Sequence, residues 1–215
     1  DNFNTDLEGD GAFICQNSWG DNFGENGFFY ISYYDTNIGT HNVVYTDIEN
    51  TDNYDHIYQS DLCGWVGQLG YNKDSIYGAN VFTAEGNETL KAASFYATGK
   101  DSQYELYVVR QFEDETSLEK MIPVASGKLG NAGYYTVDFN QGIEVDAGER
   151  YAVVLYIITP GSVHPMAIEY AADEATENVD LDDGESYISA NGSKWVSVDT
   201  VEKSNLCIKA FSDNR

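Results

Sequence analysis

The sequence is poor in basic residues and proline, and it lacks a long apolar segment. Eleven Lys and Arg stand against 36 Asp and Glu, which gives a net charge of −25 over 215 residues. Such a chain repels the phosphates of nucleic acids and an anionic membrane surface, so neither is expected as a partner. No apolar run approaches the roughly 20 residues that cross a bilayer, so membrane insertion is not expected. The acidic balance is typical of secreted proteins that self-repulsion keeps in solution.

Cysteine is also scarce, because the chain holds only Cys15, Cys63 and Cys207. An odd number of cysteines excludes a framework made of disulfides alone. Two arrangements remain open: one bridge with one free thiol, or three buried reduced thiols. No CxxC pair and no His-x-x-x-His spacing indicates zinc, and no motif requires a cofactor.

Acidic residues are densest at Asp180, Asp182 and Asp183. Calcium prefers carboxylate and carbonyl oxygens, and a cation would relieve the repulsion between these side chains. The cluster is therefore a candidate calcium site. The alternative interpretation is a solvated acidic loop.

Aromatic residues and glycine are abundant, with 17 Tyr, 10 Phe and 20 Gly. From about residue 64 onward, short segments of alternating polarity recur at fairly even spacing, with almost no helical period. This pattern predicts a mainly β fold, an antiparallel β-sandwich of the jelly-roll or lectin-like kind. The most apolar segment, 150–158, is the expected central strand, and 206–211 is expected to pair near the beginning of the sandwich. Residues 112–121 are expected to form a short helix or a loop.

An unusual stretch lies near the start of the chain, at residues 11–34. Two apolar, β-prone segments, 12–17 and 27–34, flank a glycine-rich connection, which predicts a β-hairpin. At the end of the first segment stands Asn-Ser-Trp-Gly, residues 17–20. A tryptophan is costly to expose in a turn, and the neighbouring amide is well suited to orient another polar group.

This stretch resembles the end of the catalytic domain in papain-like cysteine peptidases. The resemblance implies that Asn17 orients the catalytic histidine and that Trp19 shields that hydrogen bond from water. An amide oxygen holds an imidazole in one tautomer, so that the ring takes a proton from a thiol. The alternative is that Asn17 only satisfies groups at the strand end. Phe23 departs from the family pattern, in which Trp is usual. The matching positions are Asn17, Ser18, Trp19, Gly20, Phe23, Gly24, Glu25, Gly27, Phe28 and Phe29.

Papain-like enzymes also need a nucleophilic Cys and a His upstream of the Asn. Only sixteen residues precede Asn17 here, and none of them is His. Cys15 lies on the same strand as Asn17 and is expected to be a small strand residue. The resemblance therefore implies the C-terminal part of a larger peptidase, whose upstream segment supplies Cys and His for a polypeptide substrate. The chain alone is expected to be inactive.

The rest of the chain resembles the lectin-like β-sandwich that follows the peptidase domain in some secreted, often clostridial, papain-like peptidases. The resemblance is carried by pieces such as 53–55, 64–67, 79–82, 184–189 and 194–195. It implies two domains, 1–35 from the peptidase and 36–215 as the accessory sandwich. It also implies an extracellular or cell-surface location in a bacterium.

A fold does not establish sugar binding, so a sugar site is predicted only from the residues that could form it. Exposed aromatic faces bind sugars, and Trp65 and Trp195 are the first candidates, followed by Tyr71 and Tyr77. The competing interpretation is that these aromatic side chains fill the core. The second hypothesis is thus a non-catalytic module that binds a glycan or a surface ligand.

Overall fold

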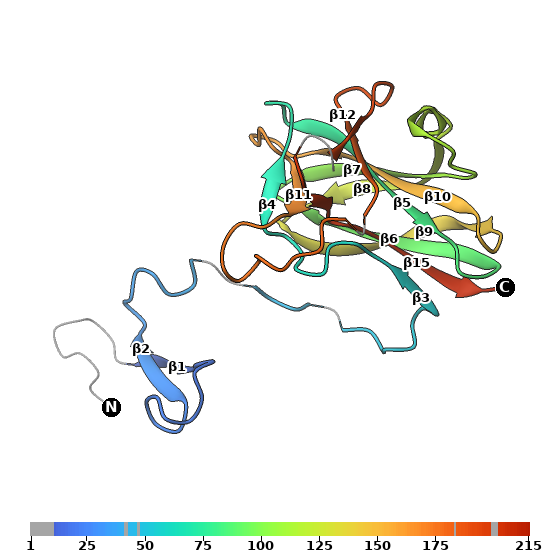
Figure 1. Ribbon diagram of the computed structural model, residues 1–215. Coiled ribbons are helices and arrows are strands. Elements are labelled where there is room, and N and C mark those ends of the chain that lie inside the picture. Colours follow the sequence, from blue (N-terminus) through green and yellow to red (C-terminus); the bar gives the residue numbers. More distant parts are fainter. Residues whose placement is uncertain (1–10, 41–42, 47, 183, 199–201) are drawn as a thin grey trace. The chain divides into compact units, whose positions relative to one another are not determined.

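The computed structural model describes residues 11–40, 43–46, 48–182, 184–198 and 202–215 (Figure 1). The chain forms two compact units, Asp1–Glu49 and Asn50–Arg215. The sequence predicts a domain boundary after residue 35, between a peptidase segment and an accessory sandwich. That boundary stays a prediction.

The first unit contains the predicted β-hairpin. Strands β1 (Ala12–Gln16) and β2 (Phe28–Ser32) pair antiparallel, with Cys15 opposite Phe29. The connection needs glycine at Gly24, where φ is +62° and a Cβ atom would lie 2.1 Å from the Phe28 carbonyl oxygen. Only a residue without a side chain fits there. The hairpin prediction is confirmed.

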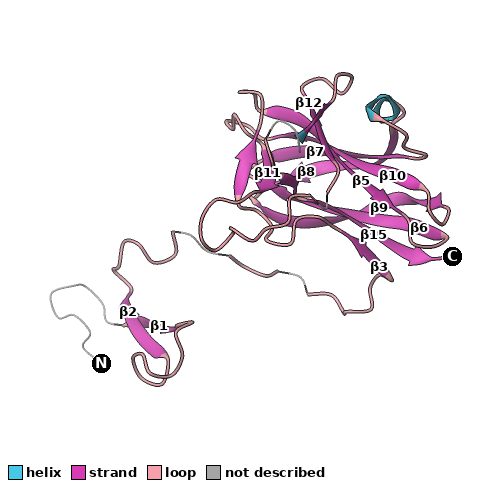
Figure 2. Ribbon diagram, viewed as in Figure 1, coloured by secondary structure: helices cyan, strands magenta, loops and turns pink. Residues whose placement is uncertain are grey.

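The second unit is built from antiparallel sheets, as Figure 2 shows, and this confirms the predicted mainly β class. A six-stranded sheet runs in the order β13-β12-β5-β10-β7-β8, a four-stranded sheet in the order β3-β15-β6-β9, and a three-stranded sheet in the order β14-β11-β4. The strands are β3 (His56–Tyr58), β4 (Gly67–Leu69), β5 (Ser75–Thr83), β6 (Glu88–Ala97), β7 (Ser102–Val109), β8 (Ile122–Leu129), β9 (Gly133–Val145), β10 (Arg150–Ile158), β11 (Met166–Glu169), β12 (Ser186–Ser189), β13 (Val196–Ser197), β14 (Asn205–Leu206) and β15 (Ile208–Asn214).

The main core lies between the inner faces of the six-stranded and four-stranded sheets. Alternate side chains of β10, such as Val153 and Leu155, meet residues of β6 such as Leu90 and Phe95. All four side chains are almost fully buried. Burial of each large apolar side chain stabilises the fold by about 1.5–3 kcal/mol.

The outer face of β10 is partly covered as well. Ala152 and Val154 pack in a second cluster with Phe112 and Leu118. Leu118 belongs to the 3-10 helix η1 (Glu115–Glu119), so of the two alternatives for residues 112–121, a short helix or a loop, the structure has the short helix. Cover on both faces explains why the middle of the segment 150–158, residues 152–155, is continuously apolar. The segment lies between β5 and β7, so its assignment as a central strand is confirmed.

The last strand ties the end of the second unit to its beginning. β15 pairs with β3 on one side and β6 on the other, as the sequence predicted for 206–211. The C-terminus therefore lies beside β3 (Figure 1). Within the described residues, no helix has the length and apolar character that a membrane span requires.

Candidate functional site

Asn17 and Trp19 lie together at the end of β1. The Asn17 side-chain nitrogen donates a hydrogen bond to the Gly27 carbonyl at 3.0 Å, and the Asn17 backbone N–H donates to the same oxygen at 2.9 Å. The Trp19 backbone N–H donates to Asn17 Oδ1 at 2.5 Å. These bonds fix the orientation of the amide. Its oxygen keeps a second lone pair, which is able to accept one more hydrogen bond.

Aromatic side chains build a wall beside this amide. Trp19 meets Phe23 edge-on at 5.0 Å between ring centroids, and Phe23 meets Phe29 in the same way at 5.6 Å. Together with Asn17 they line a hollow of about 470 Å³ on the hairpin. Trp19 is 76% exposed within the described residues, although a tryptophan is costly to leave in water. The arrangement therefore has room for a group that would cover the ring and face the amide.

The two tryptophans considered for sugar binding pack against different sheets. Trp65 is 37% exposed and contacts the ring of Tyr96 on β6. Trp195 is half-buried against Tyr77 on β5, at 6.2 Å between centroids. Trp195 belongs to the second hydrophobic cluster, so part of its area serves packing. The two side chains are not brought into one site. Their role in binding stays a prediction.

The acidic cluster is only partly described, because Asp183 lies outside the described residues. Asp180 and Asp182 are exposed, and the Asp182 N–H donates to the Asp180 carboxylate at 3.0 Å. The Asp180 carbonyl accepts a hydrogen bond from the side chain of Asn205. Among the residues the structure describes, no group of three or more His, Cys, Asp or Glu side chains is arranged to hold a metal ion. The calcium assignment is not tested by this arrangement and stays a prediction.

A buried charged group lies in the same region, and the sequence did not single it out. Asp61 and Glu169 are both fully buried, and Lys209 Nζ lies 3.4 Å from the Asp61 carboxylate. Burial raises the pKa of Asp61 to about 6, against the opposing charge of Lys209. Burial also raises the pKa of the Cys207 thiol, and the nearby carboxylates of Asp61 and Glu169 add to that effect. Asp61 lies between two strands in a polar stretch of the sequence. No pattern in that stretch indicates that its side chain is buried.

All three cysteines are free. Of the two arrangements left open, three reduced thiols is the one observed, but the expectation that each is buried is wrong. Cys207 is buried, Cys15 is intermediate and Cys63 is exposed. Cys63 lies in a loop, and its backbone N–H donates to Glu169.

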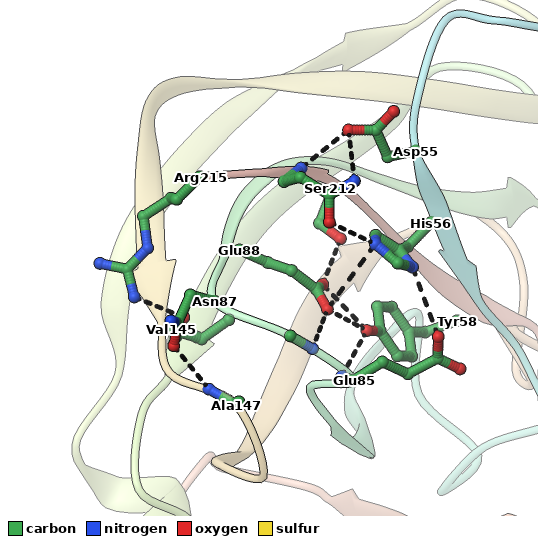
Figure 3. A network of polar contacts seen from close by, with 12 residues as sticks. Asp55, His56, Tyr58, Glu85, Asn87, Glu88, Val145, Ala147, Ser212 and Arg215 are labelled. Atoms are coloured by element: carbon green, nitrogen blue, oxygen red, sulfur yellow. Dashed lines mark hydrogen bonds and ion pairs between the residues drawn. The ribbon is translucent and has the colours of Figure 1, made fainter.

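A second polar network surrounds Glu88 (Figure 3). Glu88 is fully buried at the start of β6, and its carboxylate accepts hydrogen bonds from three donors. The Tyr58 hydroxyl donates at 2.7 Å, the Ser212 hydroxyl at 2.5 Å and the Gly86 N–H at 2.8 Å. Burial alone would raise the pKa of Glu88, but the hydrogen bonds from Ser212, Tyr58 and Gly86, helped by the charge of His56, outweigh it and lower the pKa.

His56 forms the open side of this network (Figure 3). Its Nε2 lies 2.9 Å from Asn214 Oδ1 and 4.0 Å from Glu88, and its Nδ1 lies 3.5 Å from Glu85. The hydrogen bond to Asn214 raises the pKa of His56, and the charges of Glu88, Glu85 and Asp55 raise it further against a smaller effect of burial. The network joins strands β3, β6 and β15, so it contributes to stability. The residue types alone gave no sign of this clustering, because the partners are far apart in sequence.

A family model described as "Lectin like domain" matches residues 57–212. Two solved structures of Cwp84 from Clostridium difficile are similar to the chain. One is the clostridial cysteine protease after propeptide cleavage, with a TM-score of 0.76 and 25% identity over 95% of this chain and 52% of that chain. The other holds the cysteine protease and lectin-like domains of that surface layer associated protein, with a TM-score of 0.71 and 22% identity over 95% of this chain and 46% of that chain.

The chain thus spans about half the length of the solved structures it matches. A search of curated proteins found no match.

Proposed function

The chain belongs to the lectin-like domain family, and we propose that it is the C-terminal part of a secreted papain-like cysteine peptidase. In this proposal the first unit supplies Asn17 and Trp19 to the active site, and the sandwich is an accessory domain. The chain alone is inactive, because the nucleophilic Cys and the His come from an upstream segment. Its substrate is a polypeptide, and its location is extracellular or at the bacterial cell surface. Cwp84, a surface layer associated cysteine protease, supports this by its similarity over 95% of the chain.

The orientation of Asn17 is the observation that carries the proposal. Its amide nitrogen is committed to the Gly27 carbonyl, which leaves the amide oxygen as the group that faces an incoming partner. That oxygen suits an imidazole N–H, because accepting this proton selects the tautomer whose other nitrogen is a base. Trp19 beside it would exclude water and strengthen the hydrogen bond in a medium of lower polarity.

The exposed apolar surface of the hairpin supports an upstream partner segment. Ile14 is 68% exposed and Phe13 47%, in a two-stranded sheet that buries little of its own surface. An isolated hairpin of this kind is marginally stable in water, and exposed apolar patches mark contact surfaces. This chain covers 52% of one Cwp84 structure, so about half of that structure has no counterpart here.

The test is the variant Asn17→Ala in the full-length protein, assayed for cleavage of a peptide substrate. General-base catalysis contributes about 10²–10⁴-fold, and a misoriented histidine loses part of it, so kcat should fall about tenfold or more. Asn22→Ala, in the same connection, is the control and should keep the wild-type rate. The melting temperature of Asn22→Ala should match the wild type, and that of Asn17→Ala should fall only slightly, because its amide makes two hydrogen bonds inside the hairpin. An unchanged kcat in Asn17→Ala would refute the assignment.

A second candidate function is a glycan- or surface-binding module, favoured by the exposed ring of Trp65. Trp65→Ala and Trp195→Ala should each weaken retention on an immobilised glycan if these side chains stack on sugar rings. Flat titrations of the wild-type chain against a broad glycan panel would contradict this function. The peptidase assignment would be unaffected by that result.

Calcium binding at Asp180, Asp182 and Asp183 is proposed as a structural feature of the accessory domain. Calcium would bind the folded state and raise the melting temperature, whereas a chelator would lower it. Asp180→Asn and Asp182→Asn should each reduce the calcium-dependent shift. Equal melting temperatures with calcium and with chelator would contradict the site.

A further inference from the structure

The outer face of the six-stranded sheet is covered over only part of its length. Toward one end, η1 and Phe112 lie on Ala152 and Val154. Toward the other end, cross-strand pairing places Tyr77, Tyr156 and Glu105 in one row across β5, β10 and β7. The neighbouring row holds Ser75, Ile158, Gln103 and Lys128. These rows are accessible in the described structure, with Gln103, Glu105 and Lys128 exposed.

A hollow of about 260 Å³ lies over these rows at β7, β8 and β10. Tyr156 and Ile158 provide its apolar wall. Tyr77 stacks on one face of the Tyr156 ring, with centroids 4.2 Å apart and ring planes 21° apart. The other face of Tyr156 is therefore turned toward Glu105, its partner on β7, and toward the hollow. The volume lies just below the range of about 300–1,000 Å³ for drug-sized ligands, so it suits one ring.

Most of the polar side chains that line the hollow make no polar contact with the residues that the structure describes. In the described part of the structure, the side chains of Gln103, Ser126 and Lys128 have no hydrogen-bond or ion-pair partner that would withdraw them from a ligand. The Glu105 carboxylate accepts a hydrogen bond from Tyr107, which fixes its position. An amide, a hydroxyl, an ammonium group and a carboxylate thus converge beside one aromatic face.

We propose that this hollow binds one pyranose ring of a neutral saccharide. The apolar C–H face of a sugar ring packs against the free face of Tyr156, as aromatic side chains with a polar neighbourhood allow. The sugar hydroxyls donate hydrogen bonds to the Glu105 carboxylate and accept hydrogen bonds from Lys128 and Gln103. The acceptor and the donors of the hollow thus all gain partners. An apolar peptide side chain would bury these polar groups without partners. The net charge of −25 disfavours an acidic polysaccharide.

This site differs from the positions of Trp65 and Trp195, and it does not depend on the peptidase assignment. Tyr77 links it to Trp195, because the Trp195 ring meets the edge of Tyr77. Trp195 does not line the hollow, so Trp195→Ala is expected to affect binding in the hollow only through the loss of its support for Tyr77. A failure of the Asn17 experiment would leave this inference untouched.

The experiment uses the full 215-residue chain and neutral pentasaccharides of glucose, mannose, galactose and N-acetylglucosamine. Binding is measured by titration calorimetry, with polygalacturonate as the acidic comparator. We expect at least one neutral pentasaccharide to bind. Tyr156→Leu should weaken its affinity about tenfold or more, since aromatic anchors dominate such contacts. Gln103→Ala should weaken it about threefold or more by loss of one hydrogen bond.

Two variants outside the hollow serve as controls. The first is Tyr135→Leu, at a position on β9 of the four-stranded sheet. The second is Gln68→Ala, at a position on β4. Both should bind within about twofold of the wild type, which is less than the effect of one lost hydrogen bond. Gln103 is exposed, so Gln103→Ala is expected to fold. This variant tests the site even if Tyr156→Leu fails to fold. The inference is overturned if no neutral pentasaccharide binds at millimolar concentration, if only polygalacturonate binds, or if Gln103→Ala and Gln68→Ala bind equally.

Discussion

Replacing Glu88 with glutamine should destabilise the sandwich strongly, although the two side chains have nearly the same shape. Glu88 is fully buried and accepts hydrogen bonds from Tyr58, Ser212 and Gly86. Hydrogen bonds to a charged group contribute about 1.5–3 kcal/mol each. Glutamine keeps one acceptor oxygen but turns an NH₂ group toward a donor. We therefore expect a loss of about 2–4 kcal/mol in the free energy of unfolding.

This loss is measurable by urea and thermal unfolding of the 215-residue chain. For a domain of about 150–250 residues, each kcal/mol shifts the melting temperature by about 2–4 °C, so Glu88→Gln should melt about 5–15 °C lower. The matched control is Glu85→Gln, because Glu85 is 74% exposed and only approaches His56. An exposed pair of this kind contributes about 0–1 kcal/mol, and the control should stay close to the wild type.

The pH dependence separates a charge effect from simple repacking. The pKa of Glu88 is lowered in the folded protein. Its contribution to stability is therefore present above the unfolded pKa of about 4.3 and is lost as the pH falls through the folded pKa. The difference between wild type and Glu88→Gln should shrink as the pH falls below about 4. A variant as stable as the wild type at pH 7, or a difference that stays constant down to pH 3, would refute the reasoning.

Three further predictions concern the remaining buried and titratable groups. Lys209→Met should lower stability by about 3–5 kcal/mol at pH 7, because it leaves the buried Asp61 carboxylate without its cation; chemical denaturation checks this, and a neutral effect would contradict it. The pKa of His56 is raised in the folded protein, so its stabilising effect is full below about pH 6.5 and is lost as the pH rises through the folded value. The stability difference between wild type and His56→Gln should thus be larger at pH 5.5 than at pH 8.5, and the opposite order would exclude this role. A maleimide should label the exposed Cys63 in the folded chain but reach the buried Cys207 only after unfolding, as intact mass shows; rapid labelling of both would disprove the burial of Cys207.

The sequence by itself determined the fold class and the hairpin. Alternating polarity has a period of two, so it identifies strands wherever one face is buried and the other is not. The glycine-rich connection at residues 20–27 required backbone conformations that other residues rarely adopt. The motif at Asn17 and Trp19 was also readable, because its residues are contiguous and their spacing is fixed within one turn. What these two residues do in a whole peptidase stays a prediction.

Only the tertiary structure decided which polar residues are buried and which separated segments meet. Glu88 and Ser212 are 124 residues apart, and Asp61 and Lys209 are 148 apart, yet each pair forms a close contact. Their neighbours in sequence give no period that marks them as interior. The hollow at Tyr156 likewise depends on the register of β7, β8 and β10, because each of these strands contributes only two or three of the lining residues. Pairing across strands is set by packing of the whole sandwich, so local sequence does not reveal it.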